Sequence, residues 1–172
     1  MKPAALLLTL VRAAVLVTAV AFGVAHAAEP KVTLASPGNI DASVWVDAAP
    51  RDVLAALSDG ALLASLAPDV IDAQAQADGA CVDLSVTSRG LLSPVTLRTR
   101  RCPTATGWQE TLVTSGVFER FDTAWTVAPE GTGSRVDYRV AVVVPAWVPM
   151  SVLHSRLTAS VTATLRAVAA WW

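Results

Sequence analysis

Candidate acid–base residues are few in this chain. His154 is one of two histidines and falls one position off the apolar stripe of a helical segment. General acid–base catalysis needs a group that orients the imidazole and a nucleophile within reach, and no sequence pattern supplies them. Glu110 and Asp122 are alternative cavity acids, but their places on strand-like segments predict solvated side chains. Nucleophile-elbow, zinc-protease and phosphate-loop motifs are absent, so we expect no catalytic residue and no cofactor.

Cys81 and Cys102 flank two alternating segments separated by a turn at Gly90 and Pro94, which is a hairpin pattern. Folding the hairpin about its midpoint places the two cysteines opposite each other. The same register gives the facing pairs Asp83 with Arg100, Ser85 with Arg98, and Thr87 with Thr96. The other face carries Val82, Leu84, Val86, Val95, Leu97 and Thr99.

In an oxidising compartment this register favours a disulfide between Cys81 and Cys102. The alternative is two free thiols in a hairpin that has slipped by a residue or two. No metal site is expected, because the cysteines lack a CxxC partner and His26 belongs to a segment that we expect to be removed.

That segment is residues 1–27, which are typical of a secretory signal peptide. Lys2 and Arg12 make the start positive, an uncharged run follows over residues 13–25, and Ala25-His26-Ala27 is an A-x-A cleavage site. The uncharged run is shorter than the roughly 20 residues of a membrane-spanning helix. We expect cleavage after Ala27 and a periplasmic or secreted protein; an uncleaved anchor is the alternative.

Removing residues 1–27 also explains the composition. The whole chain is 53% hydrophobic and 16% charged, which is more apolar than an ordinary soluble domain. The segment carries the excess, and the remainder is about 49% hydrophobic, a normal value. With 13 Lys and Arg against 14 Asp and Glu, the chain has no basic surplus for nucleic acid. We expect no nucleic-acid partner and a monomer.

The order of elements predicts an α+β fold. Residues 28–40 are expected to be a flexible lead, and the domain is expected over 41–172. Short strands are expected at 41–47 and 70–77, in the hairpin 81–102, and at 107–114, 116–128 and 136–142, with two short helices after Pro50 broken at Asp59-Gly60. A long helix is expected over 150–172, where apolar residues recur every three or four positions. This order predicts a curved antiparallel sheet of about seven strands wrapped around the C-terminal helix.

Four segments resemble the START-like (SRPBCC) superfamily, in its polyketide cyclase/dehydrase and coenzyme Q-binding branch. They are the stretch from Val46 to Asp59 around Ala49-Pro50, the sequence Ala67-Pro68-Asp69-Val70, the "GPF…W" stretch Ser115–Trp125, and the "GGT-x-V-x-Y" hairpin Gly131–Tyr138. The resemblance covers residues 42–170 and implies a helix-grip fold. It also implies a cavity for an apolar ligand between the sheet and the last helix.

The function predicted from these observations is an exported carrier of an apolar small molecule or lipid. The residues expected to line its cavity are Phe121, Trp125, Val136, Tyr138, Val140, Leu153, Leu157 and Val161. The alternatives are a cyclase/dehydratase-type enzyme that uses the same cavity and has a buried titratable pair, and a protein-interaction domain without a ligand.

The tryptophans bear on the same question. Trp125 and Trp45 are expected to face inward. Trp147, between two prolines, and the terminal pair Trp171-Trp172 are expected to cap the core and form the cavity rim. Peripheral membrane contact through these tryptophans is the alternative.

Overall fold

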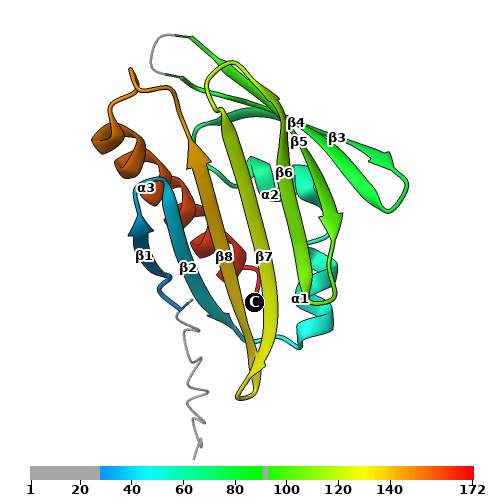
Figure 1. Cartoon of the computed structure of the whole chain (residues 1–172). Helices are drawn as coiled ribbons and strands as arrows, with labels where there is room; N and C mark the ends of the chain where they lie inside the picture. The colour runs from blue at the N-terminus through cyan, green and yellow to red at the C-terminus, as the bar shows by residue number, and fades with distance from the viewer. Residues whose placement is uncertain (1–27, 91–92) are drawn as a thin grey trace, which may run out of the picture.

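The alternating segments form one antiparallel sheet. A computed structural model describes residues 28–90 and 93–172; the predicted signal peptide, residues 1–27, lies outside them. Within this part there are eight strands: β1 (Lys31–Ser36), β2 (Asn39–Val46), β3 (Val70–Asp78), β4 (Cys81–Ser88), β5 (Val95–Pro103), β6 (Gly107–Ser115), β7 (Arg120–Glu130) and β8 (Gly133–Val143). Their order across the sheet is β1-β2-β8-β7-β6-β5-β4-β3, so β8 returns to lie beside β2 (Figure 1).

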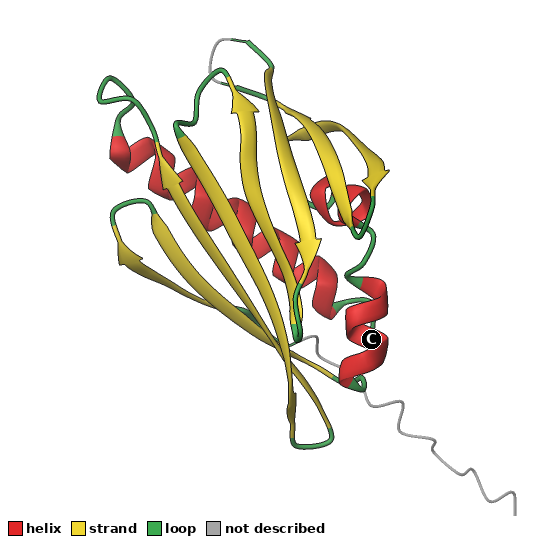
Figure 2. Cartoon of the chain, turned by 45° about the vertical axis from the view of Figure 1, so that its right-hand side comes forward, coloured by secondary structure: helices red, strands yellow, loops and turns green. Residues whose placement is uncertain are grey.

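Three helices complete the fold: α1 (Pro50–Ala56), α2 (Gly60–Ser65) and α3 (Met150–Ala169). Pro50 occupies the first turn of α1, where its missing N–H costs no hydrogen bond. The Asp59 side chain caps α2 by accepting a hydrogen bond from the backbone N–H of Leu62 at 2.9 Å. The predicted break between two short helices and the long C-terminal helix are confirmed, and with them the α+β helix-grip architecture (Figure 2).

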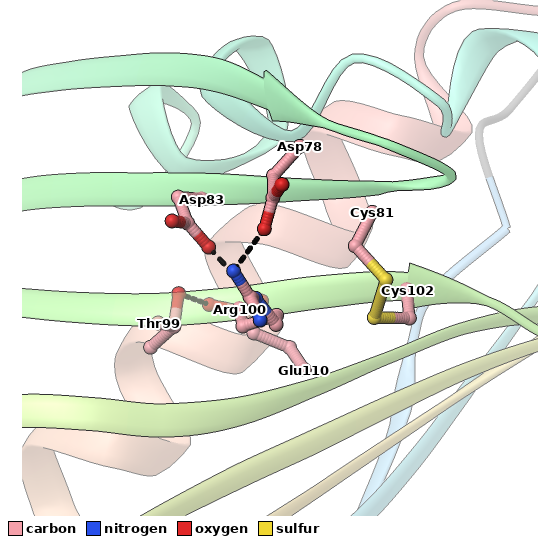
Figure 3. A network of polar contacts seen from close by, with 7 residues as sticks. All are labelled: Asp78, Cys81, Asp83, Thr99, Arg100, Cys102 and Glu110. Atoms are coloured by element: carbon pink, nitrogen blue, oxygen red, sulfur yellow. Dashed lines mark hydrogen bonds and ion pairs between the residues drawn. A yellow bond between two sulfur atoms is a disulfide. The ribbon is translucent and has the colours of Figure 1, made fainter.

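The hairpin of β4 and β5 has the predicted register. Asp83 pairs with Arg100, Ser85 with Arg98, and Thr87 with Thr96. Cys81 and Cys102 form the disulfide that this register favoured, as Figure 3 shows. On the outward face, Arg100 donates to Asp83 at 3.0 Å and also pairs with Asp78.

The N-terminal segment differs from the prediction. Residues 28–40, expected to be a flexible lead, contain β1 and the start of β2, and Lys31 pairs with Ser43. Val32 and Leu34 alternate with polar residues, but the alternation covers only residues 31–34 between Pro30 and Pro37, and all but one residue of the strand are exposed. Backbone pairing at the sheet edge orders it instead, and the described sheet has eight strands rather than about seven.

Two other boundaries also shift. The strand expected from residue 116 begins at Arg120, because the Ser115 hydroxyl accepts hydrogen bonds from the backbone N–H groups of Val117 and Phe118, each at 3.1 Å. This side-chain bonding turns the chain before β7 begins. The last helix ends at Ala169, and Ala170 is its C-cap.

The core lies where the C-terminal half of α3 packs against β2, β7 and β8. Leu165 and Val168 of α3 are fully buried there, together with Ile40 and Val136 of the sheet. In the N-terminal half of α3, Leu153 and Leu157 are only half-buried. The helix is therefore packed tightly at one end and less tightly at the other, which leaves room beneath it. Within the described residues, no helix has the length and apolarity needed to cross a bilayer.

Candidate functional site

A cavity of about 660 Å³ lies between the N-terminal half of α3 and the inner face of the sheet. Its walls come from α2, from β4 to β8 and from α3. Most of the lining is apolar and includes Leu63, Leu84, Val86, Leu97, Phe118, Phe121, Trp125, Val140, Leu153, Leu157 and Val161. Its volume is within the range of roughly 300–1,000 Å³ that is usual for small-molecule sites.

Seven of the eight residues expected to line the cavity meet at it: Phe121, Trp125, Tyr138, Val140, Leu153, Leu157 and Val161. Val136 does not line the cavity. It is fully buried in the core, where it pairs with Val44 on one side and Val127 on the other. Val136 shares the inner face with Tyr138 but lies one step nearer to the end of the sheet that α3 covers closely.

Arg101 is the least expected residue in this wall. Its side chain is 2% exposed, and its Nη2 donates to the backbone carbonyl of Leu57 at 2.7 Å. The guanidinium carbon lies 5.1 Å from the centre of the Trp108 ring, within cation–π range. The Nε–H of Arg101 has no hydrogen-bond partner among the described residues. A buried donor left without a partner is costly to the fold.

Glu110 lies beside Arg101 across the sheet. The two are register partners on β5 and β6, and Thr123 of β7 is the next partner in the same row. One carboxylate oxygen of Glu110 accepts from the Thr99 hydroxyl (Figure 3), and the other accepts from the Thr123 hydroxyl at 3.3 Å. A carboxylate has about four acceptor positions, so Glu110 retains capacity for another donor.

Tyr138 completes the polar group and is stacked on Trp125, with ring centroids 3.9 Å apart and planes 20° apart. Burial raises the pKa of the Tyr138 phenol, and the Glu110 carboxylate raises it further, so the phenol stays protonated and can donate. Burial lowers the pKa of the Arg101 guanidinium, while the negative charge of Glu110 opposes this. Arginine nevertheless remains charged in proteins. The cavity thus has an apolar body and one polar wall.

The chain matches the family model described as polyketide cyclase / dehydrase and lipid transport over residues 37–170. The chain belongs to this family. The resemblance to START-like (SRPBCC) proteins seen in the sequence is therefore confirmed. Comparison with curated proteins finds no match.

Several solved protein structures share the fold of this chain. A START superfamily protein from Mycobacterium smegmatis is 14% identical, with a TM-score of 0.64, over 78% of this chain and 99% of that chain. The Zhui aromatase/cyclase from Streptomyces is 14% identical, with a TM-score of 0.62, over 76% and 92%. A STAR-related lipid transfer protein from Xanthomonas axonopodis is 15% identical, with a TM-score of 0.59, over 83% and 97%. At these identities the likeness establishes the fold alone.

The sequence did not lead us to expect two of the residues that line the cavity. Glu110 was expected to be solvated, but it lines the cavity. It shares the inner face of β6 with Trp108 and Leu112, which is the signal that would have identified it. Arg101 was not singled out, although the predicted hairpin register already put it opposite Val82 on the apolar face. A charged residue on an otherwise apolar face is the pattern to look for.

The remaining candidates lie elsewhere in the fold. The Asp122 carboxylate accepts a hydrogen bond from Nε of Arg120, and Asp122 does not line the cavity. His154 Nε2 accepts a hydrogen bond from the backbone N–H of Gly38 at 3.1 Å, so it fastens α3 to the turn between β1 and β2. Within the part of the chain that the structure describes, no cluster of three or more potential ligand residues could hold a metal ion.

Proposed function

We propose that this family member is an exported carrier that holds one small amphipathic molecule in the cavity beneath α3. The observation that carries the proposal is a largely apolar cavity of about 660 Å³ with its polar groups gathered on one wall. Burial of the apolar body of the ligand would drive binding at roughly 25 cal/mol per Å². The polar wall would set its orientation.

The polar wall selects a ligand with one oxygen-bearing end. A hydroxyl oxygen can accept from the Arg101 guanidinium, which lines the cavity, and the hydroxyl can donate its proton to Glu110. The protonated Tyr138 phenol offers a further donor. A purely apolar molecule would leave the polar groups of this wall without partners, so an alcohol or a carbonyl compound fits the site better than a hydrocarbon.

Export belongs to the proposal. Its supports are the uncharged run and A-x-A site of residues 1–27 and the pairing of Cys81 with Cys102, which suits an oxidising compartment. N-terminal sequencing of the protein recovered from cell fractions tests this step. A periplasmic or secreted protein that starts at Ala28 is expected, and a cytoplasmic protein that retains residues 1–27 would refute export.

Native mass spectrometry of the protein from its own compartment tests the carrier function. A bound small molecule is expected in the wild type, and it should be recovered with its mass unchanged after denaturation. Ser160 lines the cavity on α3, whereas Ser155 is exposed on the same helix. Ser160→Phe should therefore fill the cavity and lose the ligand, while Ser155→Phe should keep it. A wild type with no ligand and no affinity for the apolar dye phenylnaphthylamine would overturn the proposal.

A cyclase/dehydratase-type enzyme is the second candidate, and the pairing of Glu110 with Arg101 in one cavity favours it. A carboxylate can remove a proton from a bound carbon acid while a guanidinium stabilises the developing oxyanion. This reading predicts that the native ligand changes in mass during incubation and that Glu110→Gln stops the change without preventing binding. A ligand that leaves chemically unchanged supports the carrier.

A further inference from the structure

The cavity is lined at one end of the molecule by two chain connections and by residues that follow β4. Figures 1 and 2 show that the C-terminal end of β4 and the links from β6 to β7 and from β8 to α3 lie at the same end of the sheet. Arg89, Phe118 and Trp147 come from these segments or their edges, and all three line the cavity. Since Arg89 and Trp147 are exposed whereas Arg101 is buried, the cavity opens at this end and its polar wall lies deeper.

An exposed apolar patch flanks this opening. We define the mouth patch as Trp147, Met150 and Val152. Trp147 is 73% exposed, the largest exposed fraction among the large apolar side chains of the described residues. Trp147 lies between Pro145 and Pro149, and the N–H of Val148 closes a turn on the Pro145 carbonyl at 2.9 Å. The turn therefore presents the indole to solvent at the point where a ligand would enter.

The charged residues at the opening include exposed bases. Arg89 and Arg156 are exposed there, Asp69 lies 3.7 Å from Arg156, and Glu119 is exposed on the link from β6 to β7. Arg89 forms no ion pair with any described residue. The first turn of α3 carries no acidic residue. Basic side chains beside an exposed tryptophan match a surface that is anionic at its outer layer and apolar beneath it.

We infer that the mouth patch docks on the surface of a phospholipid bilayer and that the cavity exchanges its ligand there. The indole of Trp147 would lie at the headgroup level, with Met150 and Val152 beside it and with Arg89 and Arg156 facing phosphate groups. An amphipathic ligand could then pass between bilayer and cavity without crossing water. This inference rests on the proposed carrier function for the ligand, but the docking itself can be measured without any ligand.

Flotation with phosphatidylethanolamine–phosphatidylglycerol vesicles tests the docking, with the purified protein carrying the N-terminus that it has in the cell. Trp147→Ser should lower vesicle binding about tenfold or more, because most of an indole surface leaves the interface. Trp172→Ser is the matched control, since Trp172 lies at the opposite end of the roughly 30 Å helix α3. Changing Arg89 or Arg156 to Gln should each lower binding about fivefold.

Three results would overturn the docking: a wild type that does not float, a Trp147→Ser protein that floats equally well, or a mouth patch covered by a second copy in a dimer. Phenylnaphthylamine binding without vesicles keeps the two proposals separate. The variant Met150→Ser alters a residue that does not line the cavity, so it should bind the dye normally and float poorly. If this variant binds the dye normally and floats as well as the wild type, the docking alone is refuted. If the wild type does not bind the dye, the carrier function is refuted.

Discussion

Replacement of Arg101 by methionine separates ligand recognition from folding. Arg101 stabilises the fold through its hydrogen bond to the Leu57 carbonyl, worth about 1.5–3 kcal/mol, and through its contact with Trp108, worth about 0.5–2 kcal/mol. Burying its charge costs several kcal/mol in the other direction. A flexible apolar methionine fills similar space without that cost. Because the substitution also leaves the Leu57 carbonyl and the Glu110 carboxylate without their cationic partner, the free energy of unfolding of Arg101→Met should fall by about 3–5 kcal/mol.

The loss should appear in ligand selectivity. Decanol can accept and donate at the polar wall, its methyl ether can only accept, and undecane can do neither. A hydrogen bond to a charged donor contributes about 1.5–3 kcal/mol, so the wild type should prefer the ether to undecane by roughly 10- to 150-fold. In Arg101→Met this preference should fall to within about threefold. Displacement of phenylnaphthylamine fluorescence by the three compounds measures the preference.

The matched control is Arg98→Met, because Arg98 lies on the outward face of the same strand opposite Ser85. It should retain the wild-type preference. The reasoning would be refuted if Arg101→Met kept the preference for the ether. Arg101 would then hold the fold together without recognising the ligand.

Three further predictions concern the fold. Tyr138 is the only tyrosine, so phenolate absorbance reports its ionisation directly. Its pKa is raised in the folded protein, so its contribution to stability is complete below about pH 10, where the phenol of the unfolded chain ionises. That contribution is lost as the pH rises through the higher pKa of the folded state. Thermal melts of Tyr138→Phe should show a smaller alkaline loss. Gly38 has φ +79°, and an added Cβ would meet the Val142 carbonyl, so Gly38→Ala should cost more than about 2 kcal/mol in urea unfolding. Gly79→Ala, with φ +61° and open surroundings, should cost only about 1–2 kcal/mol, and equal costs would contradict the steric argument. Replacing Cys81 and Cys102 by alanine should cost about 3 kcal/mol, and an unchanged melting temperature would show that the disulfide adds nothing.

Local patterns predicted much of the cavity wall as well as the fold. Alternation along β7 and β8 placed Trp125, Tyr138 and Val140 on the inner face, and the helical stripe placed Leu153 and Leu157 opposite them. Val136 satisfied the same pattern but lies in the core, because alternation indicates a face of the sheet and not what covers it. Edge strand β1 was missed because its alternation covers only residues 31–34 between Pro30 and Pro37, and backbone pairing with β2 orders it.

The sequence by itself determined the order of elements from β2 to α3 and favoured the register of the β4–β5 hairpin and the pairing of Cys81 with Cys102, because each depends on local periodicity and on partners close along the chain. Only the tertiary structure decided that Arg101, Glu110 and Tyr138 share one cavity and that Trp147 remains exposed at its opening. These residues come from separate strands and a loop, and they meet because α3 packs closely at one end of the sheet and leaves the other end open. Burial of a side chain depends on all the elements that cover it, and no single segment contains that information.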